Sequence, residues 1–427
     1  MILTDIAQVI YAPRKAFRKI VENPKYLGAI LILVMFIAIQ VGFSFAQFSK
    51  TQLETTYPLA GAMQTFNNST SWVGASNVNF TNNFDDYFNN TVFIANSRLS
   101  PLDPLAYYSL FGNFSMQIQA QDSRTITAAL FNISNVDASP SGFQNLSLAI
   151  QLVNPQAAPQ NTTLTLYSVS EENFYTYDLT SAIADANAIG QWGNITVPLG
   201  PNAQGWIESG VPQWQNITSL SLTFTYLTDT DITILIGALF FRGMYASPLE
   251  FDISGLLFQF LQPYVLQFLF TWMIGAALVY ALCRFAFKSP ALWKQIFIAF
   301  GFALSVMVIR GAINLIAAAT LPVNYYNYDV SFGTFFDPFI TLYYPQEALT
   351  ALSVQAQANV AAITASTAVF RNIVIAAFAI AYVWLGVLTT ISVKTLKPEF
   401  STSKCALIAA VSVSVTLLAL WLLIGVV

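Results

Sequence analysis

Histidine is absent from this 427-residue chain, and charged residues make up only 9% of it. Histidine is the commonest general base and the commonest metal ligand, so Ser-His-Asp, Cys-His and His-zinc sites are excluded. Globular proteins carry roughly a quarter charged residues, and a surface that faces water cannot be built from so few. Since 55% of the chain is hydrophobic, much of its exterior is expected to face hydrocarbon.

Cysteine is also scarce, and cationic residues are scarce in the middle of the chain. The two cysteines are Cys283 and Cys405, so residues 51–250 must fold without disulfides. The only Lys or Arg residues in that stretch are Arg98, Arg124 and Arg242. Phosphate recognition needs clustered Lys or Arg, so no nucleic-acid partner is expected. An acidic stretch rich in Asn, Thr and Ser suits an aqueous, extracytoplasmic surface.

Five long apolar runs predict a membrane all-α helical bundle, since about 20 apolar residues cross ~30 Å of hydrocarbon. We expect transmembrane helices at residues 27–47, 255–283, 295–321, 367–393 and 404–427. Basic residues precede the first run and occupy the turns after the second and fourth, which places these segments in the cytoplasm by the positive-inside rule. The sequence therefore predicts a multi-pass cell-membrane protein, with the lipid bilayer as a partner, a cytoplasmic N-terminus and an extracellular C-terminus.

The first 26 residues combine basic side chains with apolar residues at helical spacing. Arg14, Lys15, Arg18, Lys19 and Lys25 supply the charges. This pattern is typical of an amphipathic helix that lies in the membrane interface. A solvated helix that precedes the first span is the alternative.

Residues 48–250 lack long apolar runs and instead show short alternating segments, such as 146–150, 163–167 and 220–224. Alternation with a period of two predicts half-buried strands. We expect an all-β extracellular β-sandwich domain of the jelly-roll type, preceded by a helical stalk at residues 51–66. Residues 322–366 are expected to form an extracellular loop and a helix extension.

Ten Asn-x-Ser/Thr sequons occur in the chain, and all fall in the region that the charge rule places outside. They are Asn67, Asn68, Asn79, Asn89, Asn113, Asn132, Asn145, Asn161, Asn194 and Asn216. A single sequon is weak, but this confinement favours N-glycosylation. Chance in an Asn- and Thr-rich domain is the alternative for some of them.

Polar residues within the apolar runs need partners. Arg310 lies in the middle of its run, where a charge costs at least ~2.5 kcal/mol. It could line a conduction path, or it could hydrogen-bond to Asn314 or to carbonyl groups of another helix. Gln259 and Gln262 share a helical face and are expected to form interhelical hydrogen bonds.

Aromatic residues of the β region could form a platform on which a sugar ring stacks. Trp192, Trp206 and Trp214 are the candidates, together with Tyr175 and Tyr177. Packing in the core of the sandwich is the alternative for each of them.

Acidic residues could supply oxygen ligands to a structural calcium ion. The candidates are Asp229, Asp231, Glu171 and Glu172. Scattered acidic residues are more often solvated, and no pair has the spacing of a recognised glycosidase motif. Apart from covalent N-glycans and this calcium, no cofactor is expected.

The opening of the chain resembles the start of Yip1-family membrane proteins. Its residues are Pro13-Arg14-Lys15-Ala16-Phe17-Arg18-Lys19-Ile20, followed by Asn23-Pro24 and the first apolar run. The resemblance covers residues 1–47 and 255–427 and implies a bundle of five spans without a catalytic motif. Residues 48–250 stand where family members have a short loop, and their second half is similar in pattern to galactose- or carbohydrate-binding jelly rolls.

These observations predict a non-enzymatic cell-surface protein. Its Yip1-like bundle would display a glycosylated jelly roll that binds a glycan or a membrane or envelope protein. One alternative is a channel or transporter component with Arg310 in an anionic pathway, and another is a membrane-anchored hydrolase that uses Asp or Glu. Dense sequons in a domain without cysteine suit an archaeal surface, with a eukaryotic lumen as the alternative.

Overall fold

The computed structural model describes residues 2–58, 66, 68–83, 115–131, 133–134, 136–250, 253–290, 292–327 and 354–424. The chain divides into two compact units. The helical unit comprises Met1–Gln52, Ser247–Asn324 and Thr364–Val427, and the β unit comprises Leu53–Ala246 and Tyr325–Ile363.

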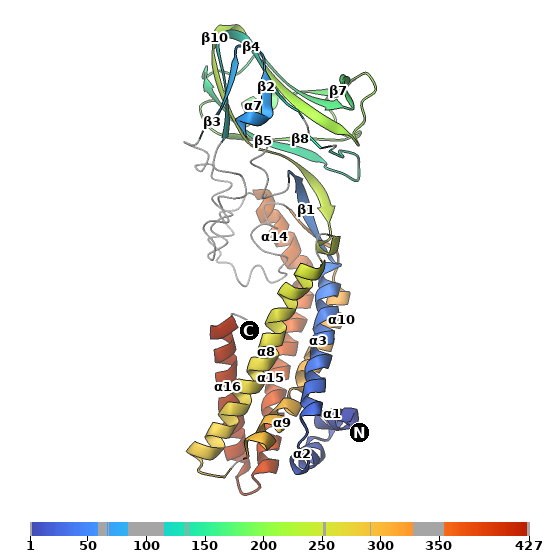
Figure 1. The fold of residues 1–427 in the computed structure, drawn as a ribbon, viewed down its shortest axis with the longest axis vertical. Helices are drawn as coiled ribbons and strands as arrows, with labels where there is room; N and C mark the ends of the chain where they lie inside the picture. Colours follow the sequence, from blue (N-terminus) through green and yellow to red (C-terminus); the bar gives the residue numbers. More distant parts are fainter. Residues whose placement is uncertain are drawn as a thin grey trace. The chain divides into compact units, whose positions relative to one another are not determined.

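The described residues of the helical unit contain five stretches that are long and apolar enough to cross a membrane by length and composition. They are built from α3 (Tyr26–Phe48), α8 (Ile253–Ala281), α9 (Trp293–Ala303), α10 (Ser305–Ala319), α15 (Ala368–Leu396) and α16 (Thr402–Ile424) (Figure 1). A π-helical turn, Leu282–Ala286, extends α8. The five predicted helices are therefore confirmed as helices. The third is interrupted at Leu304, whose ψ of −5° separates α9 from α10.

The N-terminal segment forms two helices, α1 (Ile2–Tyr11) and α2 (Pro13–Glu22), where a single amphipathic helix was predicted. Pro13 begins α2, because its fixed φ suits the first turn and its missing N–H is not needed there. The apolar side chains of both helices, including Val9 and Phe17, are buried in the same core as those of α3, α8 and α9. This face packs against protein, so it is not free to enter lipid.

The strands of the β unit pair antiparallel with one another. Their bounds are β1 Thr51–Tyr57, β2 Trp72–Gly74, β3 Val78–Asn83, β4 Ser115–Leu130, β5 Asn145–Asn154, β6 Asn161–Ser168, β7 Ser170–Asp178, β8 Gly193–Pro198, β9 Trp206–Ser209, β10 Ile217–Ala246 and β11 Asn324–Tyr326. Among the described residues of this unit, the α-helices α7 (Thr180–Asp185) and α14 (Val354–Ser366) accompany the strands. The predicted all-β domain is confirmed as a large antiparallel domain. The helix of residues 354–366 also agrees with the sequence, and residues 328–353 lie outside the described part.

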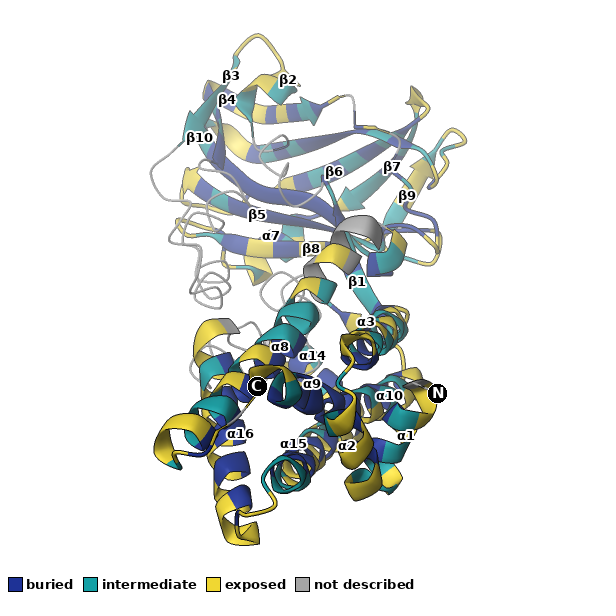
Figure 2. Ribbon diagram, turned by 60° about the horizontal axis from the view of Figure 1, so that its bottom comes forward, coloured by how far each residue is buried: buried dark blue, intermediate teal, exposed yellow. Residues whose placement is uncertain are grey.

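The 30-residue strand β10 organises this domain. On one edge β10 pairs with β4 as far as Ile236 and then, at its end, with β1. On the other edge its first half pairs with β6 and its second half with β5. β6 continues to β7 and β9, and β5 continues to β8. The inward side chains of all these layers meet in one hydrophobic core, and Figure 2 shows the alternation of buried and exposed residues along the strands.

The first residues after α3 form β1, so the predicted helical stalk at residues 51–66 is wrong for its first part. Thr, Leu and Tyr fill this segment, and β-branched and aromatic residues favour strands. β1 pairs with the end of β10, where Glu54 receives two hydrogen bonds from Arg242, the shorter 2.8 Å long. The burial of this ion pair fixes the register of β1 on β10.

Candidate functional site

One face of the sheet formed by β4, β10, β6 and β7 points away from the apolar core. Side chains alternate between the two faces of a strand, and Leu164 and Leu166 of β6 belong to the core. Thr163, Thr165 and Tyr167 therefore point outward, and the register extends this face across the neighbouring strands. We call the outward side chains the hydroxyl face: Thr125, Thr127, Asn161, Thr163, Thr165, Tyr167, Phe174, Thr176, Asp178, Ser219, Ser221, Thr223 and Thr225.

Hydroxyl groups on this face lie in rows across the strands. Thr127 lies opposite Thr223, which lies opposite Thr163. The Oγ1 atoms of Thr127 and Thr223 are 3.0 Å apart and form a hydrogen bond. Each hydroxyl has one donor and two acceptor positions, so capacity for further hydrogen bonds faces solvent. The rows thus present uncharged groups that can both donate and accept.

An aromatic pair closes one side of the rows. Tyr167 of β6 and Phe174 of β7 are directly opposite in register, with ring centroids 5.9 Å apart and both side chains half-buried. The Tyr167 hydroxyl lies 3.3 Å from Oγ of Ser221, which ties the ring to the adjacent strand. Neither Tyr167 nor Phe174 was predicted from the sequence as a site residue. The alternation of Thr and Leu over residues 163–167 placed Tyr167 on the polar face, but the register that brings Phe174 beside it was not known.

Asp178 is the one charged member of the hydroxyl face. The backbone N–H and hydroxyl of Thr180 donate to its Oδ1 at 2.8 and 2.5 Å. These hydrogen bonds lower the pKa of Asp178 below its usual value, so the carboxylate is ionised at neutral pH. Thr180 also donates to Oδ1 of Asn161 at 3.4 Å, which joins Asp178 to the row of Asn161 and Thr225.

The tryptophan platform predicted from the sequence is mostly part of the core. Trp214 is only 6% exposed, and Tyr175 stacks on it with centroids 3.9 Å apart. Trp206 is half-buried against both Trp214 and Tyr177, and its indole N–H donates to the Pro198 carbonyl at 2.8 Å. A buried ring offers no face to a sugar, so core packing is the role that the contacts give to Trp214. Trp192 is half-buried in another segment, between α7 and β8.

The acidic calcium candidates are exposed and dispersed. Asp231 accepts a hydrogen bond from the N–H of Asp122 at 3.1 Å, and Glu171 and Glu172 begin β7. Within the described residues no group of three or more Asp, Glu, Cys or His side chains could hold a metal ion. A structural calcium stays a prediction.

The sequons differ in their exposure. Asn79, Asn161 and Asn194 are exposed, whereas Asn68, Asn145 and Asn216 are half-buried. Oδ1 of Asn68 accepts hydrogen bonds from the N–H and hydroxyl of its own sequon's Thr70, at 3.1 and 3.0 Å. The remaining sequon residues lie outside the described part of the chain: Asn67, Asn89, Asn113 and Asn132.

Arg310 of α10 faces aromatic rings of α15. Its Cζ lies 4.7 Å from the centroid of Phe378 and 6.0 Å from that of Tyr382. The predicted hydrogen bond to Asn314 is not formed: Oδ1 of Asn314 and Nε of Arg310 are both buried without a hydrogen-bond partner among the described residues. Gln262 is exposed on α8, so the structure shows no interhelical role for it, and the Gln259 side chain lies outside the described part. The cation–π contact was not predicted from the sequence.

No family model matches the chain, and no curated protein matches it. Solved structures do match. A family 11 carbohydrate-binding module from Clostridium thermocellum, in complex with a β-1,3-1,4-mixed-linked tetrasaccharide, aligns over 44% of this chain and 94% of its own, at 10% identity and a TM-score of 0.25. A xylan-binding domain from Paenibacillus barcinonensis aligns over 44% of this chain and 90% of its own, at 11% identity and a TM-score of 0.19. An exo-β-agarase aligns over 41% of this chain and 24% of its own, at 12% identity and a TM-score of 0.28.

Proposed function

We propose that this chain is a non-enzymatic membrane protein whose β unit binds a neutral glycan on the hydroxyl face. The observation that carries the proposal is the pair of Tyr167 and Phe174 beside rows of threonine hydroxyls. A sugar ring has hydroxyl groups around its rim and an apolar C–H surface. Hydroxyl side chains can match the first, and an aromatic ring can stack on the second.

The charge of the face favours an uncharged ligand. Asp178 is its single charged member, and Arg124 at the neighbouring strand end donates from Nε to the Tyr226 carbonyl at 3.1 Å. A phosphorylated or sulfated ligand would meet no cation on the face and would be repelled by Asp178. A neutral polysaccharide of the outer surface is therefore the proposed class of ligand.

The proposed place of this domain is outside a cell membrane, carried by a Yip1-like bundle. The five apolar helices and the basic residues of their turns support this arrangement, as does the confinement of sequons to residues 67–216. A membrane or envelope protein subunit is the alternative partner of the β unit. An archaeal surface is the proposed setting.

Glycan binding is tested with the full chain in detergent on an array of neutral polysaccharides. Aromatic stacking contributes ~0.5–1.5 kcal/mol, so Tyr167→Ala and Phe174→Ala should each weaken binding about twofold to tenfold. Leu227→Ala is the matched control, because Leu227 is 70% exposed at another place on β10. It should leave binding unchanged.

Asn161 is handled separately in this experiment, because a glycan attached there would cover the row of Thr225 and Thr125. The array is therefore repeated with enzymatically deglycosylated protein, which should bind as well as the glycosylated chain or better. Equal binding by the parent chain and by the Tyr167 and Phe174 variants would refute the proposed face. Binding of anionic glycans but not of neutral ones would refute the proposed class of ligand.

A further inference from the structure

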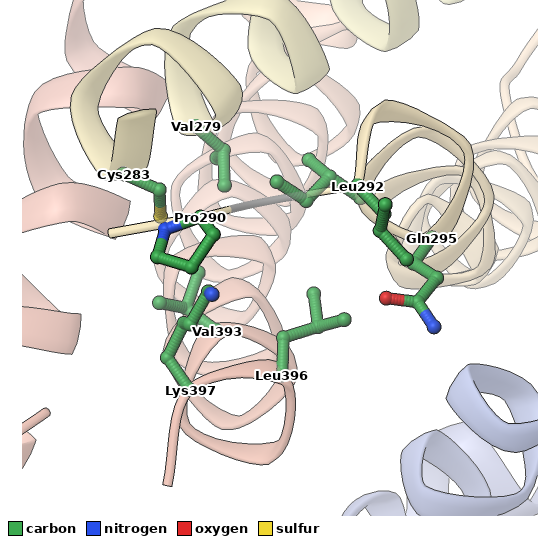
Figure 3. Close-up of a pocket in the computed structure, with 9 residues that line it drawn as sticks. Val279, Cys283, Pro290, Leu292, Gln295, Val393, Leu396 and Lys397 are labelled. Atoms are coloured by element: carbon green, nitrogen blue, oxygen red, sulfur yellow. The ribbon is translucent and has the colours of Figure 1, made fainter. Parts of the chain in front are cut away.

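A pocket of about 160 Å³ lies where the ends of α8 and α15 meet the start of α9 (Figure 3). Apolar side chains form much of its lining: Val279 of α8 and Leu292 before α9 point toward one another across it, together with Ile296, Val393 and Leu396. Gln295 adds a polar side chain to this lining. Lys397, the residue that caps α15, brings a cation to this lining. A cavity of similar size holds a benzene molecule in a protein core, so the pocket has room for a short stretch of hydrocarbon chain.

Local structure explains why a pocket forms at this point. The last turn of α8 is the π-helical turn Leu282–Ala286, which is wider than an α-helical turn. The chain then passes through Pro290, and α9 begins at Trp293. The two helices therefore leave a gap that α15 closes from the third side.

The charge of Lys397 is poorly compensated. Its side chain is only 13% exposed, and its Nζ lies 4.0 Å from Oε1 of Glu399, a side chain that is 58% exposed. An ion pair of this kind contributes about 0–1 kcal/mol. The neighbouring Lys394 is differently placed, since its Nζ donates to the carbonyl groups of Pro398 and Phe400. Lys397 thus has a weak ion-pair partner, and its ammonium group can pair with an anion that enters the pocket.

The pocket lies among other basic residues. Eleven of the 17 Lys and Arg residues lie in three segments, five in residues 14–25, three in 284–294 and three in 394–404. Contacts join these segments at one end of the bundle: Gln295 donates to the Val21 carbonyl at 3.3 Å, and Ser289 donates to Glu399 at 3.2 Å. Leu292 is 65% exposed at the same end. In a membrane, apolar and cationic groups at a helix end meet acyl chains and headgroups.

We propose that this pocket binds one anionic lipid, whose phosphate pairs with Lys397 and whose acyl chain enters between the apolar walls. The combination of several apolar lining side chains, a lysine with a weak ion-pair partner and a basic helix end selects an amphiphile over a free anion. A free phosphate would leave the apolar walls uncovered, and a zwitterionic lipid would leave the charge of Lys397 only partly paired.

Cys283 makes the site measurable, because it lines the pocket and is only 1% exposed. The full chain carrying Cys405→Ala is purified in a nonionic detergent, and the rate of Cys283 alkylation by iodoacetamide is measured. Phosphatidylglycerol, phosphatidylcholine with the same chains, and inorganic phosphate are added in separate arms. Phosphatidylglycerol should slow alkylation about tenfold, corresponding to about 1.4 kcal/mol, and the other two additions should have little effect.

Three variants test which residues cause the protection. Lys397→Met should abolish the protection by phosphatidylglycerol, whereas Lys404→Met should keep it, because Lys404 lies over the Phe287 ring and does not line the pocket. Val393→Phe should protect Cys283 without lipid by filling the cavity. Equal protection by phosphatidylcholine or by inorganic phosphate overturns the proposal, as does protection that persists in Lys397→Met.

Discussion

The contacts of the Arg310 guanidinium group allow its favourable and unfavourable contributions to stability to be compared. It gains a cation–π contact with Phe378 at 4.7 Å, worth ~0.5–2 kcal/mol. Its Nε is nevertheless buried without a hydrogen-bond partner among the described residues, and a charge within a span costs at least ~2.5 kcal/mol. We expect Arg310→Met to raise the thermal midpoint of the protein in detergent, since the lost contact is smaller than the relieved cost.

The contact itself is measured by a double-mutant cycle. Phe378→Leu should destabilise the parent chain more than it destabilises Arg310→Met, with a coupling of roughly 0.5–2 kcal/mol. Ile380→Leu serves as the control, because Ile380 is 69% exposed on the same helix and should show no coupling to Arg310. Additive effects of the Arg310 and Phe378 substitutions would show that the ring does not stabilise the cation.

At single positions, the sequence shows where a polar side chain lies among apolar ones, but it does not show which side chains that residue contacts. The cost of Arg310 in an apolar run is evident from composition, but its partners on α15 depend on how two helices pack. The same limit applies to the hydroxyl face. Alternation along β6 assigns Thr163 and Thr165 to the outside, whereas the neighbours of Tyr167 follow from the register between β6 and β7.

Among the strands, β10 contains residues whose backbone conformation differs from that of a regular strand. Gly243 has a φ of +92°, and a Cβ there would lie 3.0 Å from Nδ2 of Asn145 and 3.0 Å from Cβ of Gln144. We expect Gly243→Ala to lower the opening free energy of the pairing between β10 and β5 by about 1–3 kcal/mol, because strain and contact add. Hydrogen exchange of the backbone amides of β10, followed by mass spectrometry, measures this change.

Ala238 provides the control, because Ala238→Gly introduces glycine at a positive φ, the reverse of Gly243→Ala. It has a φ of +46° on the same strand, so Ala238→Gly relieves strain while removing one buried methyl group. These effects are each close to ~1 kcal/mol and oppose one another, so exchange should barely change. Faster exchange in Ala238→Gly than in Gly243→Ala would contradict the role given to Gly243.

Whether a segment forms a helix or a strand can be predicted where one hydrophobic pattern dominates it. The prediction fails where two environments give the same pattern. The apolar runs at 27–47 and 367–393 become α3 and α15 within a few residues. An apolar stripe on residues 1–26 suits lipid and protein equally, so the packing of α1 and α2 on the bundle was not visible. β1 was taken for a helix, because its partner in β10 lies far along the chain.

At the scale of the whole molecule, charge carries the most information. Three basic segments far apart in sequence gather at one end of the bundle, as the positive-inside rule anticipates for the turns of a membrane protein. The fold of the β unit could be predicted as antiparallel β, yet the path of β10 could not. That path rests on pairings with β4, β5, β6 and β1, which short alternating segments leave open.

The pattern of sequon occupancy tests the proposed orientation and the fold together. If the β unit lies outside the membrane, Asn79 and Asn194 should carry glycans, because both side chains are exposed. Asn216 and Asn145 should stay bare: Oδ1 of Asn216 is buried, and Nδ2 of Asn145 is packed close to Gly243. Mass spectrometry of peptides from the natively isolated protein, with and without deglycosylation, distinguishes the sites. Glycans on Asn145 and Asn216 but not on Asn79 and Asn194 would contradict the β fold, and a wholly bare chain would remove the main support for the outer location.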